Sequence, residues 1–301
     1  MPRRMRAEHG AGGACRDSER RHGAAAGCTA WADRAAHGAD HCVDFRGTSA
    51  GCANYVQRNT QVRAIEVRCV LYATAGLLPT MTDSGSSLGI DLSHVIVATM
   101  PEDTGPLLLV VVDTEEEFDW SKPFSRNNRG VTAISRIPAL QAEFETLGVR
   151  PTYCLDYPVA STPASAEVFA TIARRGTAEV GAHLHPWVTL PDIEEVTSFN
   201  SYGGNLDAAL ERAKLTSLAG AIRQHVGVDP ISFKAGRYGI APRTFDTLRQ
   251  LGFRVDLSSA PGFNWTGDGG PDFSLYPNHP YWVPGDPPML EIPTTGGMYG
   301  R

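Results

Sequence analysis

Two carboxylates follow a short apolar run in the middle of the chain. Asp113 and Glu115 come directly after the run from Leu107 to Val112. Because side chains alternate along an extended backbone, both carboxylates would point to the same side. Two carboxylates on one face are costly unless they are solvated, paired or bound to a cation. By itself the pattern is more typical of a solvated acidic loop that caps the next helix than of a metal site.

Two histidines end another predicted strand. His183 and His185 stand two residues apart in His183-Leu184-His185-Pro186, so both imidazoles can face one point if the backbone is extended. Two histidines and one carboxylate are a common ligand set for catalytic zinc, with one position left for water. The alternative is a pair of loop histidines with Trp187 packed beneath them. The histidine pair alone favours neither interpretation.

Two more predicted strands end in ionisable groups. One is followed by Arg237 and Tyr238, in Gly236-Arg237-Tyr238-Gly239, and the next ends in Asp256. An arginine in this place can pair with a carboxylate and orient it, although an ordinary salt bridge is the more common outcome. Asp256 could support a ligand histidine or the arginine from behind, through a hydrogen bond.

The elements that must position these groups alternate between strand and helix. Apolar runs predict strands at 107–112, 152–155, 179–183, 231–235, 253–257 and 289–292. Helical patterns lie between them, at about 137–147, 162–176, 205–226 and 242–252, and most of them stop at a glycine. Such alternation predicts parallel strands joined by crossover helices.

The choice is then between a closed barrel and an open, doubly wound sheet. A barrel gathers the carboxyl ends of all its strands at one mouth. An open sheet gathers only the ends beside its switch point. Because ionisable groups end four different predicted strands, we predict an α/β fold class with a distorted (β/α) barrel.

Taken in chain order, these strand ends form a recognisable series. The acidic pair, the histidine pair, the arginine followed by tyrosine, and the last aspartate resemble the motifs of the polysaccharide deacetylases, carbohydrate esterase family four. The resemblance covers about Leu107 to Thr295. It implies a distorted (β/α) barrel that holds a divalent metal, usually zinc, and removes acetyl groups from N- or O-acetylated sugars.

The resemblance also implies a role for each matching residue. Glu115, His183 and His185 would hold the metal, and Asp113 would take a proton from water. Arg237 would pair with Asp113 and hold it ionised.

Two aromatic residues and a backbone group would contact the substrate. Trp187 and Tyr238 are candidate stacking surfaces for a sugar ring, and a backbone N–H near Tyr238 would donate to the oxyanion of the substrate. Asp256 would stand behind the site as a supporting residue.

The chain departs from the family pattern in several places. The first motif reads Asp113-Thr-Glu115 instead of two adjacent aspartates, and the histidines are two residues apart instead of four. The third motif lacks the usual proline after Arg237. The family supplies a histidine as general acid beyond Thr295, and the candidate before that point is His279, in a proline-rich loop. We therefore expect a gene product that is incomplete at its C-terminus.

Two other functions remain compatible with the sequence. One is a hydrolase of the same barrel that acts on a different non-peptide amide, since the metal chemistry does not specify a sugar. The other is a non-catalytic, glycan-binding relative, which the missing general acid would favour.

Composition narrows the class of protein. The net charge is −6 without a cluster of lysine and arginine in the main domain, which argues against a nucleic-acid surface. No apolar run approaches the ~20 residues of a membrane span, and no secretory signal is recognisable. Five of the six cysteines precede Val70, which leaves Cys154 alone in the main domain and favours a reducing, cytoplasmic location.

The first 80 residues differ from the rest of the chain. They are rich in Arg, Ala, Gly, His and Cys, contain no Lys, and show no period of 2 or 3.6. We predict that 1–80 is either a disordered extension or the result of a start assigned too early, with the working start near Met81. The catalytic domain is then expected at 100–301.

Overall fold

The structure, a computed structural model, describes residues 52–55, 65–69, 88–101 and 104–296. The predicted extension at 1–80 therefore lies almost entirely outside the described residues. Two short strands fall within it, β1 (Cys52–Tyr55) and β2 (Ile65–Cys69). The predicted boundary between extension and catalytic domain stays a prediction.

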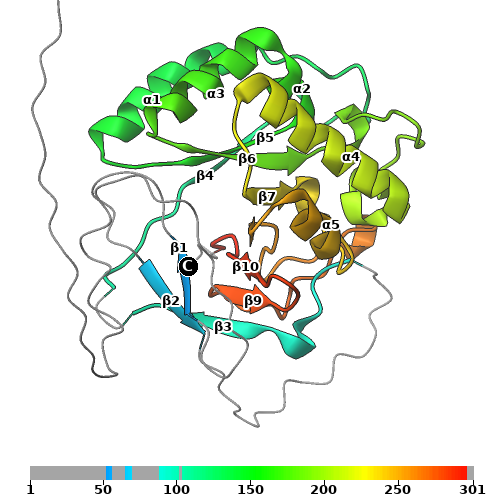
Figure 1. The fold of residues 1–301 in the computed structure, drawn as a ribbon. Coiled ribbons are helices and arrows are strands. Elements are labelled where there is room, and N and C mark those ends of the chain that lie inside the picture. Colours follow the sequence, from blue (N-terminus) through cyan, green and yellow to red (C-terminus); the bar gives the residue numbers. More distant parts are fainter. Residues whose placement is uncertain (1–51, 56–64, 70–87, 102–103, 297–301) are drawn as a thin grey trace, which may run out of the picture. The chain divides into compact units, whose positions relative to one another are not determined.

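The described strands form a single sheet whose centre is parallel (Figure 1). Its order is β1-β2-β3-β9-β10-β8-β7-β6-β5-β4. The remaining strands are β3 (Ile96–Thr99), β4 (Val111–Thr114), β5 (Thr152–Leu155), β6 (Glu179–Leu184), β7 (Ser232–Ala235), β8 (Val255–Asp256), β9 (Tyr281–Val283) and β10 (Met289–Glu291). Strands β4 to β8 and β10 run parallel, whereas β9 is antiparallel to both of its neighbours.

The order of the parallel strands decides the way in which the sheet is wound. From β4 to β8 each new strand is added beside the preceding one, and β10 follows β8. A doubly wound sheet would reverse direction at a switch point. The described strands contain no such reversal, so the predicted α/β class with barrel-type winding is confirmed.

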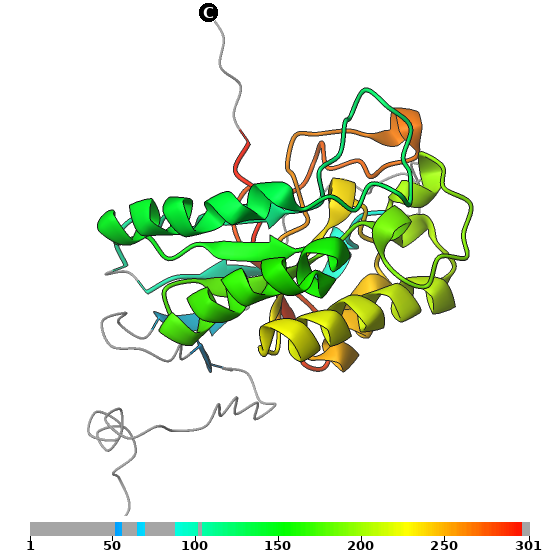
Figure 2. The same cartoon turned by 90° about the horizontal axis from the view of Figure 1, so that it is seen from above.

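Five helices connect the parallel strands in the described part of the chain. They are α1 (Ile137–Thr146), α2 (Tyr157–Ser161), α3 (Pro163–Arg175), α4 (Ala208–Ala221) and α5 (Thr244–Leu251). Helices α3 and α4 pack against β6, and Figure 2 shows the long helices lined up along the strands. The predicted stops are confirmed at Gly176, Gly227 and Gly252, each with a left-handed backbone that glycine adopts at little cost.

The first predicted strand is displaced in the structure. We expected 107–112 to be a strand buried on both faces, but β4 begins at Val111, and Leu107, Leu108 and Leu109 are 53%, 77% and 59% exposed. Among the described strands, β4 ends the sheet and pairs with β5 alone. An edge strand has a single neighbour. The apolar residues 107–109, which precede β4, are therefore not covered by other described residues.

Aromatic side chains fill the space between the sheet and the helices. Tyr153 of β5 packs on Phe169 of α3, with ring centroids 5.4 Å apart, and both are fully buried. Phe233 of β7 and Phe253, just before β8, continue this layer. The core therefore holds the carboxyl ends of β4 to β8 in fixed register, and these ends carry the candidate site.

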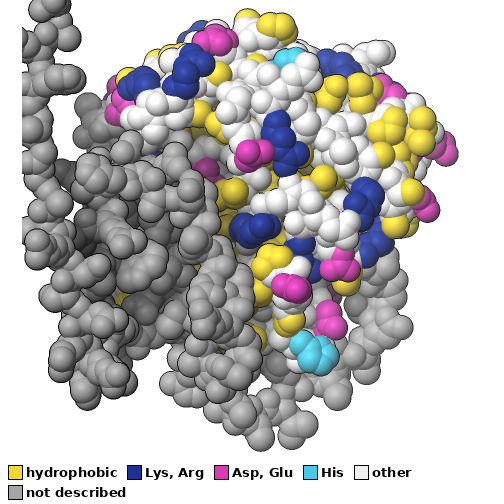
Figure 3. Space-filling view, viewed as in Figure 1, with side chains coloured by type: hydrophobic (Ala, Val, Ile, Leu, Met, Phe, Trp, Pro, Cys, Tyr) yellow, Lys and Arg dark blue, Asp and Glu magenta, His cyan; other side chains and the backbone are white. Residues whose placement is uncertain are grey.

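None of the described helices is both long and apolar enough to cross a membrane. On the face drawn in Figure 3, acidic and basic side chains are interspersed.

Candidate metal site and active site

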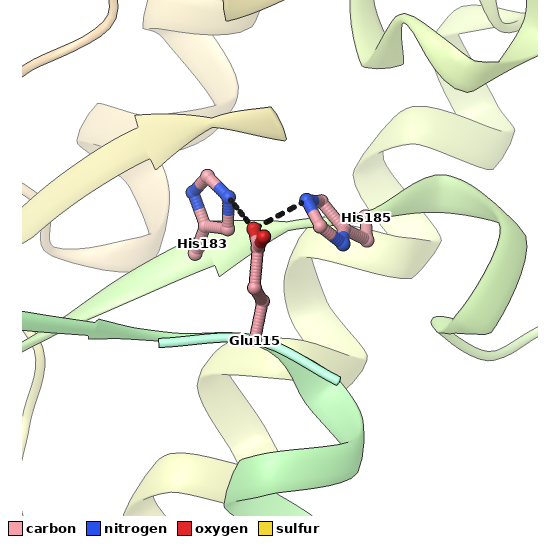
Figure 4. Close-up of side chains that lie close together, drawn as sticks. All are labelled: Glu115, His183 and His185. Carbon is pink, nitrogen blue, oxygen red and sulfur yellow. Dashed lines mark ion pairs between the residues drawn. The ribbon is translucent and has the colours of Figure 1, made fainter. Parts of the chain in front are cut away.

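Three predicted metal ligands meet at the end of the parallel strands (Figure 4). Glu115 Oε2 lies 3.3 Å from His183 Nε2 and 3.2 Å from His185 Nε2. The ligand atoms of the three residues all lie within 4.8 Å of one another. The two histidines are buried, and Glu115 keeps 29% of its side chain exposed. All three groups could therefore bind the same cation, at a place that solvent can reach.

Strand register explains this meeting. Strands β4 and β6 flank β5, with Asp113 level with Cys154 and Cys154 level with Gly181. Glu115 follows the last residue of β4, and His183 and His185 lie two and four residues beyond Gly181. Parallel strands bring their carboxyl ends to one edge, so residues 70 positions apart in sequence become neighbours.

The second nitrogen of each histidine fixes which atom is free to bind. His183 Nδ1 lies 3.1 Å from the carbonyl oxygen of Lys234, and His185 Nδ1 lies 2.8 Å from a carboxylate oxygen of Glu116. Both partners only accept hydrogen bonds, so each Nδ1 carries a proton and Nε2 is the nitrogen that faces the place where a cation would bind. Two imidazole nitrogens and one carboxylate oxygen fit zinc and related divalent cations.

Glu116 is one of the site residues that the sequence analysis missed. Its fully buried carboxylate accepts hydrogen bonds from His185 Nδ1 and from Trp187 Nε1, both at 2.8 Å. Its backbone N–H donates to Asp156 Oδ2 at 2.7 Å. A signal was present: His185 and Trp187 are two residues apart, and each brings a ring N–H that needs an acceptor. A carboxylate behind a metal-ligating histidine orients the ring and raises its basicity.

The pKa values of the buried groups around His185 are shifted strongly from their usual range. Burial raises the pKa of Glu116, but the His185 charge and hydrogen bonds outweigh it and bring that pKa down to about 2. Burial lowers the pKa of His185, yet the carboxylates of Glu116 and Glu115 raise it to about 10. Burial and the neighbouring Glu116 hold the pKa of Asp156 well above its usual range. The acids around His185 thus supply negative charge that favours a cation at this point.

Asp113 pairs with a lysine, which corrects the predicted role of Arg237. Lys234 Nζ, on β7, lies 2.6 Å from Asp113 Oδ2. Burial lowers the pKa of Lys234, but the Asp113 carboxylate outweighs this and raises it. The sequence analysis gave no role to Lys234, the third of the four residues of β7, because it considered only the arginine that follows this strand.

Arg237 binds other partners. Its guanidinium pairs with Asp268 at 2.5 Å, donates to Ser201 Oγ at 2.6 Å and lies 4.1 Å from the ring centroid of Tyr202. The backbone is left-handed at Arg237 (φ 52°) and at Tyr238 (φ 61°). This turn directs the arginine toward neighbouring loops, so the structure pairs Arg237 with Asp268 and leaves Asp113 to Lys234.

The two predicted sugar-stacking residues differ in position. Trp187 is 1% exposed, stacks on His185 and donates to Glu116, so its ring is covered by protein groups in the structure. Tyr238 lines the pocket and stacks on Trp265, with centroids 4.8 Å apart. Trp120, which is 58% exposed, also lines the pocket. The buried indole of Trp187 is bonded within the protein, whereas the exposed indole of Trp120 is available to a ligand.

Asp256 lies away from both histidines and from Arg237. It is fully buried, accepts a hydrogen bond from Ser258 at 2.6 Å and faces Glu291. Ser258 in turn accepts a hydrogen bond from the backbone N–H of Ala235, next to Lys234. In the structure Asp256 thus reaches the neighbouring strand through Ser258, and its support of a metal ligand stays a prediction. His279 is exposed, contacts Pro280 and does not line the pocket.

The converging groups enclose a small cavity of about 150 Å³. It is lined by Asp113, Glu115, Trp120, His183, His185, Lys234, Ala235, Arg237 and Tyr238.

No family model matches the chain, and no curated protein matches it. Solved structures do match it. Three of them carry the name of carbohydrate esterase family four: the Xyl-CE4 domain of a multidomain xylanase, a family 4 acetyl xylan esterase and a CE4 family pseudoenzyme. The predicted resemblance is thus matched among solved structures, at low sequence identity and at the level of the fold.

Three further solved structures that match the chain illustrate the degree of similarity. PuuE allantoinase is 17% identical with a TM-score of 0.42, and the match covers 62% of this chain and 61% of that one. IcaB from Ammonifex degensii is 16% identical with a TM-score of 0.36, covering 52% and 60%. A protein from Mycobacterium smegmatis, provisionally named a polysaccharide deacetylase, is 23% identical with a TM-score of 0.38, covering 53% and 45%. The present chain therefore matches about half to three-fifths of the length of these proteins.

Proposed function

We propose that this protein is a metal-dependent hydrolase that removes acetyl groups from N-acetylated sugars of a polysaccharide or glycolipid. The observation that carries the proposal is the joint position of Glu115 Oε2 and the two histidine Nε2 atoms in one pocket with Asp113. This pocket combines a ligand set for a divalent cation with a separate carboxylate.

The cation, zinc in our proposal, would be held by Glu115, His183 and His185. When bound, such an ion polarises a substrate carbonyl and lowers the pKa of water. The rest of the chemistry depends on groups of this chain.

Asp113 serves as the base in this proposal. Its carboxylate takes a proton from the attacking water, a task that is geometrically separate from metal binding because Asp113 is paired with Lys234. The ammonium of Lys234, 2.6 Å away, orients the carboxylate. A positioned base of this kind contributes roughly 10²–10⁴ in rate.

The turn Gly236–Tyr238 would form the wall that receives the substrate carbonyl. A Cβ atom at Gly236 would lie 2.3 Å from the Leu184 carbonyl oxygen and 2.4 Å from His185 Cδ2, so only glycine lets this turn approach the ligand histidine. The left-handed residues after it are strained, a state found mostly at functional sites. We propose that a backbone N–H near Tyr238 donates to the developing oxyanion.

Carbohydrate as the substrate is supported by the exposed aromatic surface of the pocket. Tyr238 and Trp120 both line it, and aromatic rings can stack on the apolar face of a sugar. In this proposal Trp120 takes the place that the sequence analysis gave to Trp187.

The test is acetate release from N-acetylglucosamine oligomers by purified protein, before and after chelation and after zinc is restored. We expect turnover that needs the metal, and about one metal ion per chain by elemental analysis. Release of a different carboxylate from other amides would instead support the broader amide-hydrolase alternative. Tight sugar binding with no product at any metal loading would support a glycan-binding protein.

A further inference from the structure

A lysine ammonium is sealed inside the molecule next to the proposed metal site. Lys214, on α4, has a fully buried side chain. Its Nζ lies 3.0 Å from the Pro186 carbonyl oxygen, 2.6 Å from that of Thr189 and 2.7 Å from that of Pro191. A carboxylate oxygen of Glu194 lies 3.0 Å away. We call these four oxygens the oxygen cage.

The oxygen cage needs a cation. Three carbonyl dipoles that point at one buried spot repel one another, and the carboxylate of Glu194 is 5% exposed. A buried carboxylate is strongly unfavourable without a partner. An ammonium has three N–H donors and one positive charge, which match three carbonyls and one carboxylate. Backbone carbonyls of this kind also replace the hydration shell of potassium ions in proteins.

All four oxygens belong to the segment that follows the ligand histidine. Pro186 is the next residue after His185, and the Thr189 hydroxyl donates to the His185 carbonyl at 2.8 Å. The backbone of His185 is thus tied to a loop whose carbonyls close around Lys214. The position of its ring is fixed at one end by Glu116 and at the other by this loop.

A second set of contacts anchors the far end of the same segment. Arg126 donates to the Glu194 carbonyl oxygen, and its guanidinium lies 3.7 Å from the Glu194 carboxylate. Asp192 pairs with Arg129 at 3.1 Å. These arginines bind the outer side of the loop. Lys214 binds its inner side, next to His185, so the two sets of contacts stabilise different parts of the loop.

We infer that the oxygen cage is a monovalent-cation site which the chain fills with its own ammonium, and that Lys214 is thereby a positioning residue for His185. The natural occupant is Lys214 itself. An external potassium, ammonium or alkylammonium ion would occupy the cage once that side chain is removed.

The test is chemical rescue of Lys214→Ala. The substitution deletes three methylenes and the ammonium, and n-propylammonium restores these same groups. Melting temperatures are measured for metal-free protein in tetramethylammonium, potassium, ammonium and n-propylammonium chloride at equal ionic strength. We expect Lys214→Ala to melt several degrees lower in tetramethylammonium chloride and to recover in the other three salts, most fully in n-propylammonium.

Two further variants separate the cage from a general salt effect. Lys122→Ala removes a lysine that is 73% exposed, and we expect neither destabilisation nor ion-specific recovery. Glu194→Gln leaves the ammonium in place, so we expect a smaller loss of stability and no recovery by the small cations. Lys214→Ala that fails to fold in every salt, or that responds to all four alike, would overturn the cation site.

The positioning role has its own readout, and it rests on the proposed metal site. Zinc affinity, measured by competition with a chromophoric chelator, should fall about 10- to 100-fold in Lys214→Ala, as for other groups behind metal ligands. It should recover in potassium or n-propylammonium chloride. Unchanged affinity would overturn the positioning role. If the parent protein binds no zinc, the proposed function fails, whereas the melting experiment still decides on the cage.

Discussion

Two clusters of ionisable side chains lie at the ends of the parallel strands, and they differ in how they carry charge. In the first, Glu115, His183 and His185 turn their free ligand atoms toward one point in a pocket. In the second, Asp256 and Glu291 face each other in the interior, and burial raises the pKa of both. The second oxygens of this pair, Asp256 Oδ2 and Glu291 Oε2, have no hydrogen-bond partner among the described residues.

The difference shows what separates a ligand site from a structural pair. Each histidine of the first cluster is satisfied on its far side, so its near nitrogen is left for a cation. The carboxyl groups of the second cluster are satisfied by Ser258 and Ser259 on one side, and can satisfy each other only by sharing a proton. Four predictions test this contrast.

The largest effect is expected when one of the three proposed metal ligands is removed. Glu115→Ala should abolish metal binding, because a three-ligand site would lose its carboxylate, and acetate release should fall to the level of metal-free protein. His183→Ala and His185→Ala should behave alike. Glu117→Gln is the matched control, since that side chain is exposed and bonds to Thr132 and Ala133. Elemental analysis beside acetate assays decides, and full metal content in all three ligand variants would place the metal elsewhere.

The next effect concerns rate without loss of metal. Asp113→Asn should keep the metal and lower kcat by roughly 10²–10⁴, as expected for a positioned base. Lys234→Met should also keep the metal and lower kcat, because the carboxylate loses the ammonium at 2.6 Å. Arg237→Met should lower kcat less, since its partner is Asp268. A larger loss in Arg237→Met than in Lys234→Met would return the orienting role to the arginine.

A smaller change is expected when the support behind the metal ligand is neutralised. Glu116→Gln keeps the size of the side chain but removes the charge beside His185, so zinc affinity should fall about 10- to 100-fold. Trp187→Phe, which removes the indole donor to Glu116 together with part of the buried ring, is the milder companion for zinc affinity. Affinity is measured by chelator competition. If Glu116→Gln binds zinc like the parent, the carboxylate does not tune His185.

Particular residues explain how far the sequence could predict the fold and the site. The strand ends at 155 and 235 follow from apolar runs bounded by polar residues, and β6 ends one residue beyond its predicted end at His183. This alignment of strand ends brings Glu115 to the histidines. The partners of long side chains do not follow in this way. Arg237 turns away because two residues become left-handed, and Lys234 reaches Asp113 across two strands. Neither event leaves a periodic signal in the sequence.

The same limit explains why the sequence analysis did not predict the contact between Glu116 and His185. Strict alternation places it on the opposite side from Glu115, but β4 ends at Thr114, so the rule no longer applies where the two glutamates stand. Both therefore serve His185, one at each ring nitrogen. Composition and period predict which strand ends carry charge, whereas loop geometry decides which charges meet.

The smallest effect is expected at the buried pair, and it depends on pH. Glu291 has a raised pKa in the folded protein, so its contribution to stability is fully present below the unfolded value of about 4.3 and is lost as pH rises through the folded value. Glu291→Gln mimics the protonated form: its amide oxygen can still accept from Ser259, and its NH₂ can donate to Asp256. Near pH 8 the variant should therefore be more stable than the parent by about 1 kcal/mol or more, which corresponds to roughly 2–4 °C in Tm.

Near pH 4 this difference should disappear, because parent and variant then both carry a neutral group at position 291. Thermal melts of both proteins across pH 4–9 measure it, with Glu143→Gln as the control at an exposed glutamate. A variant that is less stable than the parent at pH 8 would mean that Glu291 is ionised in the folded protein. The pair would then be a second place where the fold holds uncompensated negative charge, and the contrast with the metal-ligand cluster would fail.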